Sequence, residues 1–139
     1  MVDTLTKEER SKRMSLIRSK DTSPELALRR ALHALGLRYR LHNKHLPGKP
    51  DIVFPRRKLA VFVHGCFWHR HDNCKVATMP KSNTAFWQEK FDRNVARDQR
   101  SCEQLKVLGW RVEIAWECEL GHKDVTCVAQ RLQHVLLKD

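Results

Sequence analysis

Cysteine and histidine side chains gather in one loop of this sequence in a pattern that suits a metal ion. Cys66, His71 and Cys74 follow one another closely, and Cys118 comes just past the end of a predicted strand. Thiolate and imidazole groups are the usual ligands of structural zinc, which four of them enclose in a tetrahedron. An isolated cysteine is more often a small core residue, but this polar loop has no apolar periodicity of its own to hold it in place. The pattern therefore predicts one structural Zn2+ on these four residues.

A second group of residues has the types that acid–base and phosphate chemistry use. Asp51 follows Gly48-Lys49-Pro50 at the mouth of an apolar strand, where a carboxylate is costly unless it is paired or binds a cation. Pro-Asp opens many strands harmlessly, so this motif decides nothing alone. Its meaning comes from what converges on it: Glu25 opens a helix, His64 ends the next strand, and His69 follows within a few residues.

One carboxylate interrupts the apolar stripe of a long predicted helix. Asp98 completes the helical spacing of a stripe that otherwise consists of Trp87, Phe91, Val95, Cys102 and Leu105. A carboxylate in the middle of a core stripe needs a partner. The partner could be a cation in a buried salt bridge. Alternatively, Asp98 orients a histidine that acts as a base, and His69 is the natural partner for that role.

Two adjacent aromatic residues, Phe67 and Trp68, stand in the same histidine-rich loop, and Trp87 opens the long helix nearby. Adjacent loop residues do not easily pack into one core face. Beside a basic surface, such rings suit stacking on bases or insertion between them. The alternative is a small loop core around the metal site.

The elements that must position these residues follow from periodicity and from helix and turn signals. Ser23-Pro24-Glu25 begins a helix that Gly36 ends. Strands are expected over 37–42, 51–54, 59–63 and 110–116, a long helix over 84–108 and a last helix over 123–137, with 65–83 irregular. The order αβββαβα predicts an α/β fold, with one mixed central sheet flanked by helices and a parallel crossover around the long helix. Apolar helix positions place Cys102 and Cys127 in the core.

The bulk composition points to a polyanionic partner. The chain has 139 residues, and 27 Lys and Arg against 16 Asp and Glu give a formal net charge of +11. No apolar stretch is long enough for a membrane span or a signal peptide, so we expect a cytosolic protein that binds no membrane. Residues 1–22 are expected to form a basic arm and 23–139 one domain. The arm, with Arg13, Met14 and Arg18, is either a solvated helix or a segment that lies along a DNA groove.

Several motifs together resemble the very-short-patch repair (Vsr) mismatch endonucleases. They are the run His64-Gly65-Cys66-Phe67-Trp68-His69-Arg70-His71, Pro47-Gly48-Lys49-Pro50-Asp51 before it, Phe86-Trp87, Asn94-Val95 with Arg97-Asp98, Leu108-Gly109-Trp110-Arg111-Val112, and Trp116-Glu117-Cys118. The resemblance implies a restriction-endonuclease-like catalytic domain behind a DNA-binding arm. It also implies Mg2+-dependent nicking of one strand, 5′ to the thymine of a T:G mismatch that arises when 5-methylcytosine deaminates.

The resemblance also implies a role for each candidate residue. Asp51 would bind Mg2+ together with the backbone carbonyl of Val63, since the Glu-x-Lys pair of restriction enzymes is absent from 59–64. His69 would be the general base, held by Asp98, while His64 and Glu25 would hydrogen-bond waters around the metal. A wedge of Phe67, Trp68 and Trp87 would enter the DNA, with Met14 approaching from the opposite groove.

The resemblance also implies the binding partners of the protein, while two other functions stay open. The expected partner is double-stranded DNA with a T:G mismatch, with mismatch-repair accessory proteins beside it, for a monomer at the bacterial nucleoid. One alternative is a zinc-stabilised DNA-binding protein without catalysis, which leaves Asp51 and Asp98 unexplained. Another is a restriction-type nuclease that cuts matched duplex, for which no aromatic wedge is needed.

Overall fold

A computed structural model describes residues 22–121 and 124–138. Its elements, in chain order, are α2 (Ser23–Ala34), β1 (Arg40–Leu41), β2 (Ile52–Phe54), η1 (Pro55–Arg57), β3 (Leu59–His64), α3 (Cys66–His69), α4 (Thr84–Val107), β4 (Arg111–Trp116), η2 (Glu117–Glu119) and α5 (Asp124–Leu137). The predicted basic arm, with Arg13, Met14 and Arg18, lies outside the described residues. Within those residues, no helix has the length and apolar character that crossing a membrane requires.

A four-stranded sheet forms the centre of the molecule, in the order β1-β2-β3-β4. The β1–β2 and β2–β3 pairs are antiparallel, and β3 pairs with β4 in parallel, from Leu59 opposite Arg111 to His64 opposite Trp116. The parallel pair is joined through α4, since parallel strands need a long connection. Residues of β2 and most of β3 are buried, as their continuous apolar sequence predicts.

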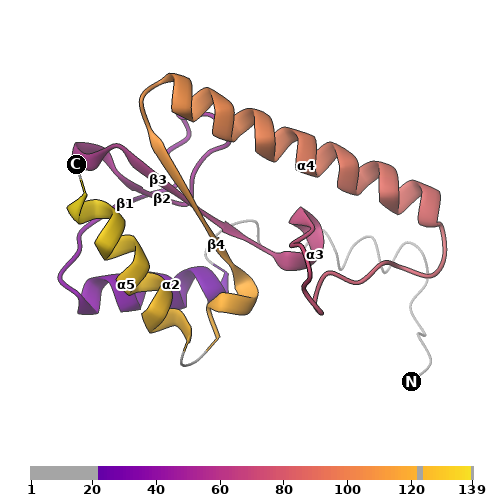
Figure 1. Cartoon of the computed structure of the whole chain (residues 1–139), viewed down its shortest axis with the longest axis horizontal. Helices are drawn as coiled ribbons and strands as arrows, with labels where there is room; N and C mark the ends of the chain where they lie inside the picture. The colour runs from indigo at the N-terminus through magenta and orange to yellow at the C-terminus, as the bar shows by residue number, and fades with distance from the viewer. Residues whose placement is uncertain (1–21, 122–123, 139) are drawn as a thin grey trace.

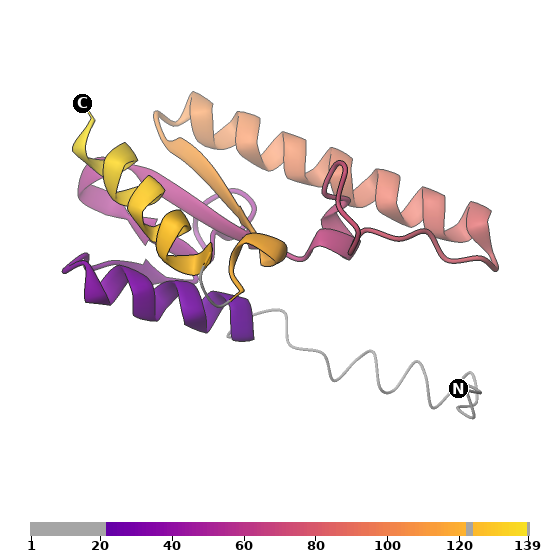
Figure 2. The same ribbon diagram turned by 60° about the horizontal axis from the view of Figure 1, so that its bottom comes forward.

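Helices cover both faces of this sheet (Figure 1). On one face α2 and α5 pack side by side over a core that includes Leu28, Ile52, Val61 and Leu132. On the other face α4 lies over a smaller core of Val53, Ala60, Phe62 and Leu105. Figure 2 shows the same three layers from a second direction. The mixed α/β fold with flanking helices, predicted from the sequence, is therefore confirmed.

Local differences from the predicted elements have identifiable causes. The strand expected over 37–42 is reduced to Arg40–Leu41. Leu37 and Tyr39 pack against the core before it, and His42 ends it with a positive φ of 50°. The loop expected to be irregular contains the short helix α3, whose end residue Arg70 also has a left-handed backbone. Cys127 is exposed and not in the core, because α5 packs through a neighbouring stripe that includes Val128 and Leu132; Cys102 is only half-buried.

Candidate active site

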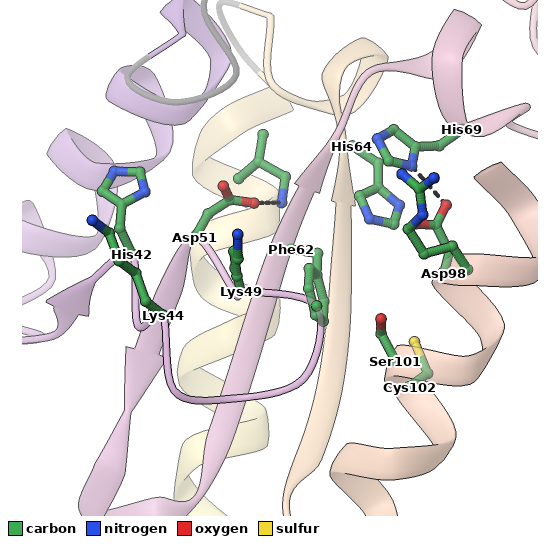
Figure 3. Close-up of a pocket in the computed structure, with 13 residues that line it drawn as sticks. His42, Lys44, Lys49, Asp51, Phe62, His64, His69, Asp98, Ser101 and Cys102 are labelled. Atoms are coloured by element: carbon green, nitrogen blue, oxygen red, sulfur yellow. Dashed lines mark hydrogen bonds and ion pairs between the residues drawn. The ribbon is translucent and has the colours of Figure 1, made fainter.

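A pocket of about 310 Å3 opens at the edge of the sheet where β2 begins and β3 ends (Figure 3). Because these two strands are antiparallel, the start of one lies beside the end of the other, which brings Asp51 and His64 together. The helix α3 follows directly and contributes His69, while α4 contributes Asp98 from across the pocket. Four predicted site residues from distant parts of the chain therefore line one pocket.

Asp51 occupies the sheet side of this pocket. One of its carboxylate oxygens, Oδ2, accepts a hydrogen bond of 2.7 Å from the backbone N–H of Val63. Burial raises the pKa of Asp51 to about 7, and the charge of nearby Glu25 acts in the same direction, while the Val63 hydrogen bond opposes it. A carboxylate in this position is thus poised to ionise when a positive charge comes near.

His69 and Asp98 form a close polar contact across the pocket. Nδ1 of His69 lies 2.6 Å from Oδ2 of Asp98, and both side chains are partly exposed. The ring of His64 stacks on that of His69, with centroids 3.8 Å apart and planes only 5° from parallel. Burial lowers the pKa of His64 to about 4, and the neighbouring His69 lowers it further, so His64 is neutral near pH 7. Of the two rings, His69 is the one that a carboxylate orients.

A third group of polar residues, Glu25, Arg29 and His42, lies next to Asp51. Glu25 is only 1% exposed, and its Oε2 accepts a 2.7 Å hydrogen bond from Arg29. The same guanidinium lies 2.8 Å from Nε2 of His42, which must accept the hydrogen bond because arginine cannot. Glu25, His42 and Asp51 each offer a ligand atom within 4.8 Å of the others. Sequence reasoning had not singled out His42, since a histidine at the end of an alternating strand is an unremarkable surface residue.

The four predicted zinc ligands also lie together. One side-chain donor atom each from Cys66, His71, Cys74 and Cys118 falls within 4.8 Å of the others. Nδ1 of His71 is 3.6 Å from the Cys66 sulfur and 3.4 Å from the Cys118 sulfur. A tetrahedral zinc ion with ordinary bond lengths separates its nitrogen and sulfur ligands by about 3.6 Å. The donor set and its spacing therefore fit a zinc ion.

Two further contacts fix this Cys/His group against the sheet. The ring of His71 stacks on Trp116 at the end of β4, with centroids 4.3 Å apart and planes 11° from parallel. The Cys66 N–H donates a 3.0 Å hydrogen bond to Oε1 of Glu117. Burial raises the pKa of the Cys66 thiol to about 12, so a thiolate at this position requires a cation beside it.

The predicted wedge residues form a separate aromatic cluster where α3 meets the start of α4. The ring centroids of Phe67, Trp68 and Trp87 lie 5.1–6.0 Å from one another. Phe91, which is 1% exposed, forms the base of the cluster, while the other three rings are half-buried. The cluster is thus anchored like a small core yet keeps part of each outer ring accessible. None of these rings lines the pocket around Asp51.

Basic residues surround both sites, and sequence reasoning gave them no role. The ammonium of Lys90 lies 5.2 Å from the Trp68 ring, and the Arg70 guanidinium lies 4.2 Å above Phe91. Lys44, Lys49 and Arg97 line the pocket. Lys49 lies two residues before Asp51 in the motif Gly48-Lys49-Pro50-Asp51, which could have indicated a role. A surface lysine next to a proline, however, has no distinctive pattern of its own.

Comparisons with known proteins agree with a nuclease. Residues 2–75 match the family described as DNA mismatch endonuclease Vsr. The chain is 49% identical over 136 residues to the type II nicking enzyme V.XorIIP of Xanthomonas oryzae pv. oryzae, with 98% of each chain covered. It is 42% identical over 136 residues to the DNA mismatch endonuclease Vsr of Escherichia coli, covering 96% of this chain and 86% of the relative.

A solved structure with the same fold is the catalytic domain of the homing endonuclease I-Bth0305I. The TM-score is 0.57, and the match covers 85% of this chain and 100% of that domain. The sequence identity is 21%, so the likeness concerns the fold alone.

Proposed function

Because the chain belongs to the Vsr family of DNA mismatch endonucleases, we propose that it nicks one DNA strand on the 5′ side of the thymine in a T:G mismatch. As a member of this family it is a DNA endonuclease that hydrolyses phosphodiester bonds, so the alternative of a DNA-binding protein without catalysis is set aside. The proposed biological role is very-short-patch repair of deaminated 5-methylcytosine. Mismatch-repair accessory proteins and a monomeric state stay predictions.

The observation that carries this proposal is the meeting of Asp51 with the His69–Asp98 pair in one pocket. We assign His69 as the general base. Its Nδ1 is engaged by Asp98, which leaves Nε2 to accept a proton from the attacking water. Asp98 sets the orientation and tautomer of the ring, as a carboxylate does in other base–orienter pairs.

A divalent metal fits the Asp51 side of the pocket. The fold is that of a nuclease, and Asp51 is a carboxylate whose burial disfavours its charged form until a cation compensates. In an antiparallel ladder the N–H and C=O of one residue face the same side, so the Val63 carbonyl is expected to face Asp51 as its N–H does. We propose that both oxygens hold Mg2+, which when bound would neutralise charge on the phosphate.

Glu25 and His64 are proposed to hydrogen-bond waters in the same site. Nδ1 of His64 is buried and has no hydrogen-bond partner among the described residues, so a water or another ligand is needed there. Glu25 is buried within ligand distance of Asp51 and His42.

The Cys66, His71, Cys74 and Cys118 group is proposed to hold Zn2+ with a structural role. Four protein ligands leave no open position for a substrate. The ion would tie the segment after α3 to the end of β4. It would thereby fix His69 and the aromatic residues of α3, which lie between two of the ligands in sequence.

We propose that Phe67, Trp68 and Trp87 test base pairing. A mismatched pair is easier to separate than a matched pair, so insertion of aromatic rings distinguishes the two. Support comes from the exposed parts of these rings and from the Lys90 ammonium beside them, which suits a phosphate backbone. Arg13, Met14 and Arg18 are proposed to contact the DNA from the arm.

A plasmid-nicking assay tests this function. Plasmids that carry a single T:G mismatch or the matched T:A pair are incubated with the protein, with and without Mg2+. We expect open-circular product only from the mismatched plasmid with Mg2+. Equal nicking of both plasmids would instead favour a nuclease that acts on matched duplex.

A further inference from the structure

A tight turn places Lys49 in the pocket with Asp51. Gly48 and Lys49 both have left-handed backbones, with φ of 76° and 52°, and the Lys49 N–H donates a 3.1 Å hydrogen bond to the carbonyl of Leu46. A positive φ is uncommon for a residue that carries a side chain, so this conformation of Lys49 is unfavourable. Such strain persists only where the surroundings impose it.

The surroundings that impose it belong to the opposite wall of the pocket. A side chain at Gly48 would place its Cβ 2.7 Å from Cβ of Ser101, on α4 one turn after Asp98. On the other side of the turn, Pro50 is fully buried and Asp51 is bonded to the backbone of Val63. The position of the Lys49 backbone is therefore tied both to Asp51 and to the helix that carries Asp98.

The side chain of Lys49 projects into the pocket near Asp51 (Figure 3). Among the described residues, no salt bridge or side-chain hydrogen bond involves its ammonium group. The Lys49 ammonium is therefore a cation that no carboxylate of the described residues neutralises. The same pocket is lined by Asp51, His64, His69 and Asp98. An unneutralised ammonium on a fixed backbone is suited to bind an anionic group of the substrate.

We propose that Lys49 binds a non-bridging oxygen of the scissile phosphate and stabilises the negative charge that grows there during hydrolysis. In that step the oxygen of water bonds to phosphorus, and its proton passes to His69. The bond from phosphorus to the leaving sugar oxygen breaks, and that oxygen takes up a proton from solvent. Lys49 exchanges no proton with the reacting groups and acts only through its charge and its hydrogen bond. It thereby supplies a cation where the Glu-x-Lys pair of restriction enzymes is absent.

This inference rests on the proposed catalytic role of the pocket. The test compares Lys49→Ala and Lys49→Arg with Lys58→Ala as a matched control. Lys58 is also an exposed lysine with a left-handed backbone, φ 50°, but it stands at the opposite end of β3. Both alanine variants remove one charge and leave the same kind of backbone strain. Single-turnover nicking and DNA affinity are measured for each, on the duplex that the wild type nicks.

We expect Lys49→Ala to slow the single-turnover rate by about 100-fold, as loss of one transition-state donor does elsewhere, with DNA affinity changed little. Lys49→Arg should recover much of the rate, and Lys58→Ala should match the wild type. A Lys49→Ala rate like that of the wild type would overturn the inference. So would equal losses in both alanine variants, which would reflect net charge alone.

Sulfur substitution at the scissile phosphate locates the contact. A phosphorothioate at this position has two diastereomers, and in each of them sulfur replaces a different non-bridging oxygen. Sulfur accepts hydrogen bonds poorly. In the wild type, the diastereomer whose sulfur faces Lys49 should be slow; in Lys49→Ala that additional slowing should disappear, while the other diastereomer behaves as before. Identical sulfur effects in both proteins would overturn the contact. An Asp51→Ala variant that still nicks would overturn the proposed site itself, whereas inactive Asp51→Ala beside normal Lys49→Ala would overturn only the role of Lys49.

Discussion

At the scale of single residues, Asp51 shows how a catalytic carboxylate conflicts with stability. Its burial raises its pKa to about 7, so ionisation near neutral pH costs folding free energy in the absence of a metal. The charge of Glu25 adds to that cost, and the single Val63 hydrogen bond offsets only part of it. A residue that is unfavourable for the fold yet lines a pocket is typical of a functional site.

The first prediction concerns Asp51→Asn in protein without added Mg2+. Because the folded-state pKa is raised, the stability associated with neutral Asp51 is complete below about pH 4 and is lost as the pH rises through about 7. An amide does not ionise and can still accept the Val63 N–H. The variant should therefore melt several degrees higher than the wild type at pH 8, and the difference in melting temperature should be much smaller at pH 5.

Thermal denaturation of both proteins at the two pH values measures this difference. Other titrating groups are common to the two proteins and cancel in the comparison. A melting difference that does not grow with pH would contradict the description of Asp51 as a buried, hard-to-ionise carboxylate. The variant should also lose nicking activity, which separates its gain in stability from function.

The second prediction concerns the pair of His69 and Asp98. Asp98→Asn should keep the fold, since amide and carboxylate have similar size, but should misorient His69 and slow nicking. Because both residues serve one role, the double variant His69→Ala/Asp98→Asn should be little slower than His69→Ala alone. Single-turnover rates of the four proteins complete the cycle.

If His69 and Asp98 acted independently, the fold losses in nicking rate of the two single variants would multiply in the double variant. Such a result, together with a large fall in the melting temperature of Asp98→Asn, would identify Asp98 as a structural ion-pair partner. Both roles require the 2.6 Å contact between Nδ1 of His69 and Oδ2 of Asp98, and the nicking rates distinguish them.

At the scale of elements, the Cys/His group joins segments that the sheet alone does not hold. Cys66 begins α3 and Cys118 lies in η2, just after β4, while His71 and Cys74 come from the loop between α3 and α4. No residue of that loop between 70 and 83 is buried. The metal site is thus the principal restraint we expect on its position.

The third prediction concerns Cys118→Ser. A hydroxyl is a poor zinc ligand, so the variant should retain less than one equivalent of zinc and melt at a lower temperature. Because α3 carries His69 and two of the wedge residues, Phe67 and Trp68, nicking should fall as well. Metal analysis and thermal denaturation check this, with Cys127→Ser as a control, since Cys127 is an exposed cysteine on α5. Equal zinc content and melting temperature in all three proteins would contradict the structural zinc site.

The fourth prediction isolates the wedge from the chemistry. Phe67→Ala or Trp68→Ala should reduce the preference for T:G over T:A duplex more than it reduces zinc content or melting temperature. Their half-buried rings can be removed without opening the pocket, because neither lines it. Equal loss of activity on both duplexes would indicate that the cluster is only a core for the loop.

Elements with a strong periodic pattern could be predicted from the sequence, whereas elements set by tertiary contacts could not. The continuous apolar run of β3 and the start of α2 at Ser23-Pro24 appear where expected, although Thr22 occupies the cap position and makes no side-chain capping hydrogen bond. β1 is shorter than its alternating pattern suggests, because Leu37 and Tyr39 pack against the core without joining the ladder. The contact between Asp98 and His69 followed from a carboxylate in an apolar stripe. No local pattern could reveal His42, whose position depends on Arg29 from another element.

At the scale of the whole molecule, α4 connects recognition with cleavage. It carries Trp87 near its start and Asp98 in its middle, eleven residues further, which a helix spaces by about 16 Å. Figure 1 shows α4 running along one side of the molecule, from α3 to the sheet. One rigid helix therefore fixes the distance between the proposed wedge and the scissile phosphate. The net charge of +11 provides the general attraction to DNA on which this geometry acts.

The fifth prediction is the position of the nick, because a cut placed by the mismatch requires both recognition of the T:G pair and hydrolysis in the Asp51 pocket. A duplex with one T:G mismatch, end-labelled on the thymine strand, is incubated with Mg2+ and the products are resolved at single-nucleotide resolution beside a T:A duplex of identical sequence. We expect one cut immediately 5′ to the mismatched thymine, no cut in the other strand or in the T:A duplex, and no product with Asp51→Ala. Cleavage of the T:A duplex at the same rate, or product from Asp51→Ala, would contradict it.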